Sequence, residues 1–279
     1  MTKIQWTQET WNPFTGCTKC SSGCLNCYAA TMVKRLQGMG LSKYSNGFEP
    51  AFHPDELSIP EKSKKPSIIF VCSMSDIFHE KFPDQYVERV FDVMKSNPQH
   101  IFQLLTKRAE RMGQYIESHY SQKDKCPKNI WVGVTVESRV YAFRSIILAG
   151  IKNRLSGKVF LSCEPLLDDL TQSGIYFTKD GISGIVDFCA MDWIICGGES
   201  GPKARPMDPQ WVRNLKNKCA WCAVPFFFKQ WGAWGPDGIK RNKERNGCLL
   251  DGEVIQEWPE ELRKFLKKEI HVQSPKGDR

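Results

Sequence analysis

The feature that most constrains the fold is a regular alternation of short apolar runs with segments of helical periodicity. Helices are predicted at residues 83–95, 139–149 and 209–222, and another follows residue 108 and reaches residue 116. The apolar runs are the predicted strands, and they span residues 68–72, 101–105, 130–134, 159–163, 193–196 and 225–228. Continuous apolar strands separated by helices predict a parallel sheet that is buried on both faces. At least six such units in 279 residues predict an α/β fold, a (β/α) barrel that is TIM-like or partly open.

Polar residues follow nearly every predicted strand. They are Ser73, Ser75 and Asp76, then Thr106 and Lys107, Thr135 and Glu137, Glu164, Gly198 and Glu199, and finally Lys229 and Gln230. In a barrel of parallel strands these positions converge at the C-terminal mouth, where active sites lie. Capping of the helix that follows each strand is the alternative explanation. The repetition at strand after strand favours an active site.

Four cysteines, Cys17, Cys20, Cys24 and Cys27, fall within eleven residues ahead of a predicted helix at 29–38 and an irregular segment at 41–65. Thiolates held this close together need a metal to offset their repulsion. Three interpretations remain open: a [4Fe–4S] cluster with three protein ligands, a structural zinc site with four, and buried free thiols. The compact spacing, just ahead of a predicted barrel, favours the iron–sulfur cluster over zinc. We expect the cysteine loop at the C-terminal mouth of the barrel.

The remaining expectations come from composition and from the ends of the chain. Residues 1–235 are predicted to form the barrel domain with its cysteine loop, and residues 236–279 a C-terminal extension packed on it. No apolar run is long enough to span a membrane, and the N-terminus lacks an apolar signal segment, so a cytoplasmic protein with no membrane partner is expected. The twelve cysteines, including Cys219 and Cys222, are then expected as thiols or ligands rather than disulfides. The net charge of +8 mildly favours a nucleic acid or nucleotide partner.

Two resemblances sharpen this interpretation. Residues 20–28 resemble the radical S-adenosylmethionine signature, including Tyr28 after the last cysteine. Over about residues 4–235 the chain resembles the phage-associated three-Cys-motif proteins, through the stretches 6–28, 73–79, 102–108, 131–137, 163–167, 197–207 and 227–232. In that family the three cysteines correspond to Cys17, Cys24 and Cys27, which leaves Cys20 as an additional thiol. The radical S-adenosylmethionine spacing uses Cys20 in place of Cys17.

The resemblance implies a [4Fe–4S] cluster and S-adenosyl-L-methionine, which one electron from a reductant would cleave to a 5′-deoxyadenosyl radical. It implies cofactor contacts from Tyr28, from Ser73, Ser75 and Asp76 at the methionine amino group, from Thr135 and Glu137 at the ribose, and from Gly197 and Gly198 at the adenine. Substrate-facing catalytic residues would be Lys107, Glu164, Glu199 and Lys229. The expected substrate is a nucleic acid or nucleotide-like molecule, and a separately encoded partner protein is a further expectation. The alternative function is a non-catalytic nucleic-acid-binding protein that zinc or a cluster stabilises.

Overall fold

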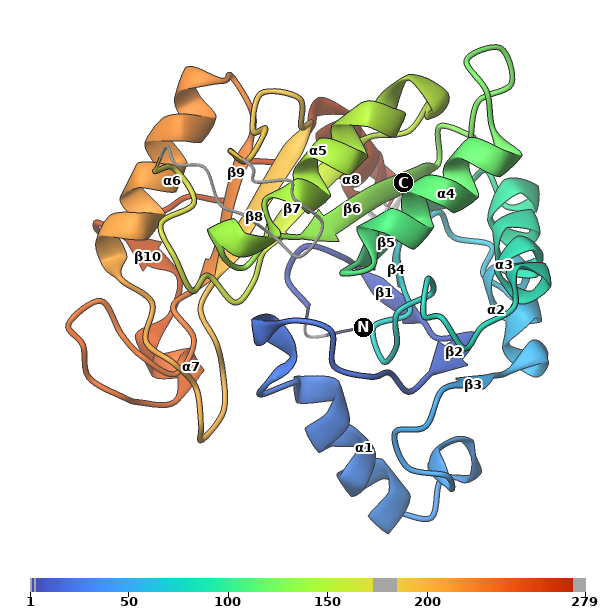
Figure 1. The fold of residues 1–279 in the computed structure, drawn as a ribbon, viewed down its shortest axis with the longest axis horizontal. Helices are drawn as coiled ribbons and strands as arrows, with labels where there is room; N and C mark the ends of the chain where they lie inside the picture. Colours follow the sequence, from blue (N-terminus) through green and yellow to red (C-terminus); the bar gives the residue numbers. More distant parts are fainter. Residues whose placement is uncertain (1, 3, 173–184, 273–279) are drawn as a thin grey trace, which may run out of the picture.

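The computed structural model describes residues 2, 4–172 and 185–272. Its centre is a seven-stranded sheet in which every pair of neighbours is parallel (Figure 1). In spatial order the strands are β1 (Glu9–Trp11), β4 (Ile68–Val71), β5 (Ile101–Thr106), β6 (Ile130–Thr135), β7 (Val159–Cys163), β8 (Trp193–Gly197) and β9 (Phe226–Gln230). β1 and β9 are the two edges of this sheet, so within the described residues it is a half-barrel rather than a closed one. The predicted α/β fold with parallel strands is confirmed in its partly open form.

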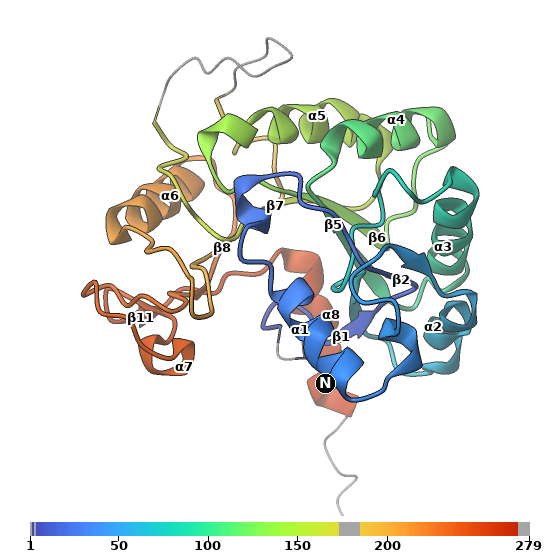
Figure 2. The same cartoon turned by 60° about the horizontal axis from the view of Figure 1, so that its bottom comes forward.

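Helices cover the convex side of the sheet, as the periodicity predicts (Figure 2). Buried side chains of the strands, such as Ile69 and Phe102, belong to one apolar core with helix residues such as Val87 and Phe91. Burial of these apolar stripes stabilises the helices more than their intrinsic propensity does. The helices are α3 (Asp84–Ser96), α4 (Ala109–His119), α5 (Phe143–Ile151) and α6 (Pro209–Trp221), with the short 3₁₀ turns η4 (Arg139–Tyr141) and η5 (Lys152–Arg154) flanking α5.

A second core fills the concave side of the sheet. Its members are mostly aromatic: Trp6, Phe70, Trp131, Phe160, Trp193 and Phe227, together with Ile68, Ile195 and Leu262. We call this cluster the aromatic floor. Helix α8 (Glu260–Val272) brings Leu262 into this aromatic floor. The ring of Trp258, just before α8, lies 5.0 Å from that of Phe227. The C-terminal segment therefore closes the side of the sheet that the outer helices leave open.

The segment after β9 continues along this edge of the sheet. It contains α7 (Lys243–Asn246) and the antiparallel pair β10 (Leu249–Leu250) and β11 (Glu253–Val254). The backbone N–H of Phe228 donates to the carbonyl of Ile255 at 2.7 Å, which satisfies part of the free edge of β9. The division of the chain at residue 235 stays a prediction, and residues 273–279 of the predicted extension lie outside the described residues. No helix in the described part of the chain is long and apolar enough to cross a membrane.

The cysteine loop lies between two short strands that pair antiparallel, β2 (Phe14–Thr15) and β3 (Ala51–Phe52). It contains the 3₁₀ turn η1 (Ser22–Cys24) and leads into helix α1 (Tyr28–Gly38), which matches the predicted helix. α1 stands apart from the outer helices in both views (Figures 1 and 2). The segment predicted to be irregular contains only η2 (Ser42–Tyr44), β3, η3 (Pro54–Ser58) and α2 (Ile59–Lys62).

One expectation about the cysteines is wrong. Cys189 and Cys222 form a disulfide with their Cα atoms 4.9 Å apart, although 33 positions separate them in the sequence. Cys189 precedes β8 and Cys222 follows the last residue of α6, so the pair meets only after the chain has passed through β8 and α6. Local spacing does not reveal such a pair. Cys219 is a buried free thiol, as expected.

Candidate active site at the cysteine loop

A cavity of about 210 Å³ lies between the cysteine loop and the carboxyl ends of the parallel strands. Trp6 and Phe70 of the aromatic floor form its base. The candidates from the sequence that line it are Cys17, Cys24, Cys27, Tyr28, Ser73, Ser75, Asp76, Lys107, Thr135, Glu164 and Lys229. Cys20, Glu137, Gly197, Gly198 and Glu199 lie outside its lining. The fold therefore brings the cysteine loop and most of the polar strand ends to one place.

The loop begins at a tight turn on Gly16. This residue has φ +79°, and a Cβ there would overlap the carbonyl of Glu49, so only glycine fits. The Gly16 N–H donates to the Met74 carbonyl at 3.0 Å, and the Ser75 hydroxyl donates to the Gly16 carbonyl at 2.6 Å. Ser73 similarly donates to Asn12 Oδ1 at 3.1 Å. Both serine hydroxyls thus anchor the N-terminal segment, although both residues also line the cavity.

Glu137 holds the middle of the cysteine loop through the backbone of Gly23. Its side chain is fully buried, and Oε1 accepts the backbone N–H of Gly23 at 3.0 Å. Oε2 pairs at 3.0 Å with Arg144, whose side chain is 2% exposed and whose guanidinium lies 4.3 Å from the centre of the Tyr141 ring. Tyr141 in turn accepts the N–H of Ser22 at 3.0 Å. These contacts make Glu137 an anchor of η1, and they leave it away from the cavity where a ribose contact was expected.

Glu199 holds the other side of the loop. One oxygen accepts from Asn26 Nδ2 at 3.0 Å and from the backbone N–H of Arg205 at 2.8 Å, and the other pairs with Arg205 Nη2 at 2.6 Å. Arg205 also donates to the Ser22 carbonyl at 3.0 Å. Burial opposes ionisation of Glu199, but the hydrogen bonds from the side chain and backbone of Arg205 and from Asn26, together with the charge of Arg205, outweigh it and lower the pKa of the carboxyl. Glu199 is therefore a loop anchor, outside the cavity where a substrate contact was expected.

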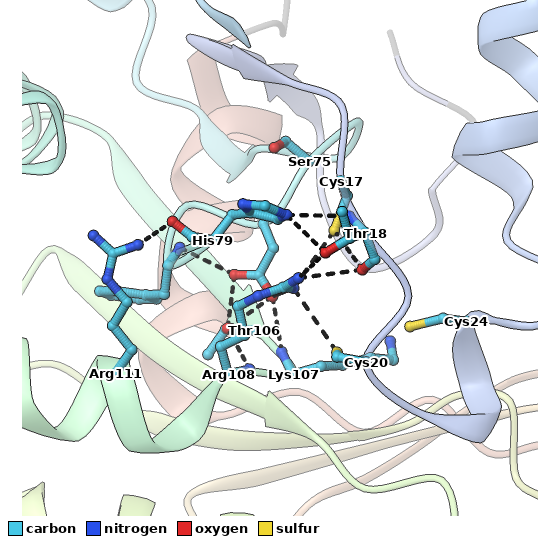
Figure 3. Close-up of polar contacts among 12 residues, drawn as sticks. Cys17, Thr18, Cys20, Cys24, Ser75, His79, Thr106, Lys107, Arg108 and Arg111 are labelled. Atoms are coloured by element: carbon cyan, nitrogen blue, oxygen red, sulfur yellow. Dashed lines mark hydrogen bonds and ion pairs between the residues drawn. The ribbon is translucent and has the colours of Figure 1, made fainter. Parts of the chain in front are cut away.

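Arg108 joins the start of the loop to the end of β5 (Figure 3). Its Nη1 lies 3.5 Å from the Cys17 sulfur, 3.8 Å from the Cys20 sulfur and 3.3 Å from Asp76 Oδ2. Its Nη2 donates to the Thr18 carbonyl at 3.2 Å. Sequence reasoning did not single out Arg108, although it directly follows Lys107 in the polar segment after β5. Its position beside Lys107 was the signal available.

Buried His79 fixes the same part of the loop. Its Nε2 lies 2.9 Å from the Thr18 hydroxyl, and the backbone N–H of Lys81 donates to its Nδ1 at 3.1 Å. Burial lowers the pKa of the imidazole, which favours the neutral ring that these contacts need. His79 acts here as a structural group.

The surroundings of the thiols differ. A hydrogen bond from the Cys20 thiol, supported by the Lys107 ammonium, lowers the pKa of Cys24 to about 4. Burial, together with the Asp76 carboxylate, raises the pKa of Cys17 to about 11. Cys24 is thus the thiol that its neighbours favour as a thiolate at neutral pH.

Inside the cavity, charged groups of opposite sign lie close together. Lys229 Nζ is 2.6 Å from Glu164 Oε2, and Lys107 Nζ is 3.4 Å from the Thr135 hydroxyl. Asp76 accepts from the Thr106 hydroxyl at 2.7 Å and from the Lys107 N–H at 3.1 Å, which fixes its carboxylate. At the ends of β5, β7 and β9 the cavity therefore offers the ammonium groups of Lys107 and Lys229 and the carboxylate of Glu164, beside the fixed carboxylate of Asp76.

A family model described as "Protein of unknown function (DUF5131)" matches residues 1–259. The chain belongs to this family. The family description names no source, so the predicted phage association stays a prediction. No protein among the curated sequences compared matches the chain.

Solved structures of spore photoproduct lyase resemble this DUF5131 member. A variant with bound AdoMet and dinucleoside spore photoproduct has a TM-score of 0.39 and 12% identity, over 94% of this chain and 72% of that one. Another variant with the dinucleoside photoproduct has a TM-score of 0.40 and 13% identity, over 93% and 70%. At these TM-scores the overlap is loose, and the function proposed below rests on the residues of the site itself.

Two glycines predicted to approach a cofactor have another explanation in this DUF5131 protein. A Cβ on Gly198 would overlap the carbonyl of Trp231, and the Gly198 N–H donates to the Gln230 carbonyl at 2.9 Å. A Cβ on Gly197 would come within 3.2 Å of Glu164 Oε2. Gly198 therefore permits β8 and the end of β9 to pack closely, and Gly197 leaves room for the Glu164 side chain.

The donor set decides how well the site suits a metal. Within the described residues, no three Cys, His, Asp or Glu side chains converge as metal ligands. Cys17, Cys24 and Cys27 nevertheless line one cavity, whereas Cys20 lines a separate hollow with Arg108 and Tyr141. Three thiols from one loop, facing a shared space, fit an iron–sulfur cluster by their chemistry. The shared cavity favours Cys17 over Cys20 as the third member of the set.

Proposed function

We propose that this protein is a radical S-adenosylmethionine-type iron–sulfur enzyme. The observation that carries the proposal is that Cys17, Cys24 and Cys27 share one cavity with the polar ends of a parallel half-barrel. Active sites of parallel barrels lie at this end of the strands. Three thiols leave one position of a [4Fe–4S] cluster without a protein ligand, which suits a cofactor that must bind to the iron.

Cys17, Cys24 and Cys27 would hold the cluster, with Tyr28, Ser73, Ser75, Asp76 and Thr135 around the cofactor. When bound, the cluster would supply one electron and an iron atom free to bind S-adenosyl-L-methionine. The protein's own groups then have separate tasks. The ammonium groups of Lys107 and Lys229 suit an anionic group, and Glu164 suits a cation. Trp6 and Phe70 close the base of the cavity with apolar surface and exclude water there.

The remaining roles follow from this assignment. The proposed substrate is a nucleic acid or nucleotide-like molecule, which the net charge of +8 favours. A reductant must deliver the electron, either directly or through a separately encoded partner protein. A cytoplasmic location belongs to the same proposal because the partly exposed thiols of Cys17, Cys24 and Cys27 need a reducing compartment.

The test is anaerobic purification followed by iron, sulfide and zinc analysis. We expect a brown protein with iron and sulfide, and release of 5′-deoxyadenosine after addition of dithionite and S-adenosyl-L-methionine. Replacement of Cys17, Cys24 or Cys27 by Ala removes the iron, whereas Cys20→Ala retains it. A protein that holds cluster and cofactor but releases no 5′-deoxyadenosine would contradict the radical chemistry.

The second candidate function is a non-catalytic, zinc-stabilised nucleic-acid-binding protein. The observation that favours it is the hydrogen bond from the Cys20 thiol to Cys24, which lowers the pKa of Cys24. Cys20 is therefore close enough to serve as a fourth thiolate ligand for zinc. A colourless protein with stoichiometric zinc, lost equally in all four cysteine variants, would decide for this function.

A further inference from the structure

A groove lies next to the cavity, along the exposed side of α1. It shares Cys27 and Tyr28 with the cavity lining, so the two hollows adjoin at these residues. Its volume is about 710 Å³, and the segment 200–203 forms the opposite wall. A molecule that lies in this groove would reach the cavity past Tyr28. We call this hollow the basic groove.

The charge of the basic groove has one sign. Four cationic side chains line it, Lys19, Lys34, Arg35 and Lys203, and no carboxylate does. The ion pairs among the described residues use none of these four. The sequence explains this for the wall formed by the cysteine loop and α1, because no Asp or Glu occurs between Glu9 and Glu49. Uncompensated charge of one sign along a groove attracts a polyanion.

The same groove exposes apolar side chains between its cations. Leu25 is 58% exposed, Tyr28 54% and Met32 45%, and all three line the groove. Apolar and aromatic side chains interleaved with cations are the composition of surfaces that bind single-stranded nucleic acids, where bases stack and phosphates pair with Lys and Arg. A duplex hides the faces of its bases and could use only the cations.

A second hollow adjoins the basic groove. It has a volume of about 530 Å³ and shares Ser200, Gly201 and Pro202 with the basic groove. It adds Lys240 and Lys243, and Glu244 is the one carboxylate in its lining. The cations therefore continue beyond the groove, away from the cavity.

We propose that the basic groove binds a single-stranded polynucleotide and leads one of its nucleotides past Tyr28 to the cavity. This deepens the proposed function, on which it rests for the chemistry in the cavity, by assigning a strand rather than a free nucleotide as the substrate class. Phosphates lie along Lys19, Lys34, Arg35 and Lys203, and bases lie against Leu25 and Met32. Single-stranded DNA and RNA share this chemistry.

The test is fluorescence anisotropy with labelled single-stranded DNA and RNA of about 12 nucleotides, a length within the usual site sizes of single-strand binders. Four phosphate contacts on a single strand predict a slope of log K against log salt of about −3 between about 50 and 200 mM salt. The double variant Lys34→Glu/Arg35→Glu should bind about 30-fold more weakly at the lower salt, and the two remaining contacts should give a slope of about −1.4. The matched control is Lys123→Glu/Lys125→Glu, which makes the same charge change on an exposed loop after α4, far from α1 in both views (Figures 1 and 2). It should bind like the wild type.

Three outcomes would overturn the proposal: no binding of either single strand, equal weakening in the control variant, or equal binding of duplex or of polyglutamate with the same number of charges. Iron content and 5′-deoxyadenosine release are measured on the same preparations. If the protein contains no iron and releases no 5′-deoxyadenosine while binding remains specific for single strands, the proposed chemistry is wrong and the groove assignment stands. If iron is present and 5′-deoxyadenosine is released without strand binding, only the groove assignment is wrong.

Discussion

At the scale of single residues, two buried carboxylates hold the cysteine loop from different strands of the sheet. Glu137, after β6, accepts the N–H of Gly23, and Glu199, after β8, accepts from the Asn26 side chain. Each carboxylate is balanced by an arginine close to it in the sequence, Arg144 or Arg205. Buried charges are tolerated only when they are paired and hydrogen-bonded in this way. The acidic residues after these strands therefore position the loop rather than line the cavity.

The Glu137–Arg144 pair gives the first prediction. Glu137→Gln leaves the guanidinium of Arg144, 2% exposed, without a counter-charge. Loss of one partner of a buried pair costs about 3–5 kcal/mol. Urea denaturation should show this loss in the free energy of unfolding, and Glu117→Gln on the exposed side of α4 should change it by less than about 0.5 kcal/mol. Equal stability of the two variants would contradict the assigned role.

Glu199 gives a prediction about pH. Its pKa in the folded protein is lowered, so the carboxylate contributes stability that is present above the unfolded pKa of about 4.3 and is lost as the pH falls through the folded pKa. Glu199→Gln should therefore be less stable than the wild type by about 1–3 kcal/mol at neutral pH. The difference should shrink below about pH 4. Unfolding free energies measured across this range, with exposed Glu253→Gln as control, check the sign; a difference that grows on acidification would contradict it.

At the scale of elements, the chain shows which features a sequence carries locally. β5, β6 and α3 were predictable because each is an apolar run or an amphipathic stripe of its own. β1 was missed because it has only three residues, of which Trp11 alone is buried. The convergence of the strand ends was predictable from parallel topology. The partners of Glu137 and Glu199 were not, because burial and loop contacts depend on tertiary packing.

The Cys189–Cys222 disulfide is the other feature that local sequence patterns do not predict, and its contribution to stability can be tested. Closing a loop across 33 positions stabilises a fold by about 3–4 kcal/mol in the chain-entropy model. Cys189→Ser/Cys222→Ser should lower the free energy of unfolding by about this amount under oxidising conditions. A reductant should lower the stability of the wild type toward that of the variant and leave the variant unchanged. An equal effect of the reductant on both proteins would contradict a stabilising disulfide.

At the scale of the whole molecule, the half-barrel is completed by parts of the chain that are distant in sequence. The N-terminal segment supplies Trp6, the C-terminal segment supplies Trp258 and Leu262, and the strands supply the rest of the aromatic floor. Because Trp6 and Phe70 also form the base of the cavity, the floor connects the C-terminal helix to the candidate active site. An open parallel sheet exposes its concave face unless another element covers it. Here α8 and the cysteine loop cover it from different sides.

This arrangement predicts that α8 stabilises the whole fold rather than only itself. Leu262→Ala removes a side chain that is fully buried in the floor, and core truncations of this kind cost about 2–5 kcal/mol. Leu249→Ala, at a position 52% exposed in β10, is the matched control and should cost less than about 1 kcal/mol. Hydrogen exchange on the same variants distinguishes local from global loss. If Leu262→Ala speeds exchange in β6 and β7 as well as in α8, the C-terminal helix and the sheet unfold as one unit. If exchange rises only in α8, that helix is a separable addition to a half-barrel that is stable without it.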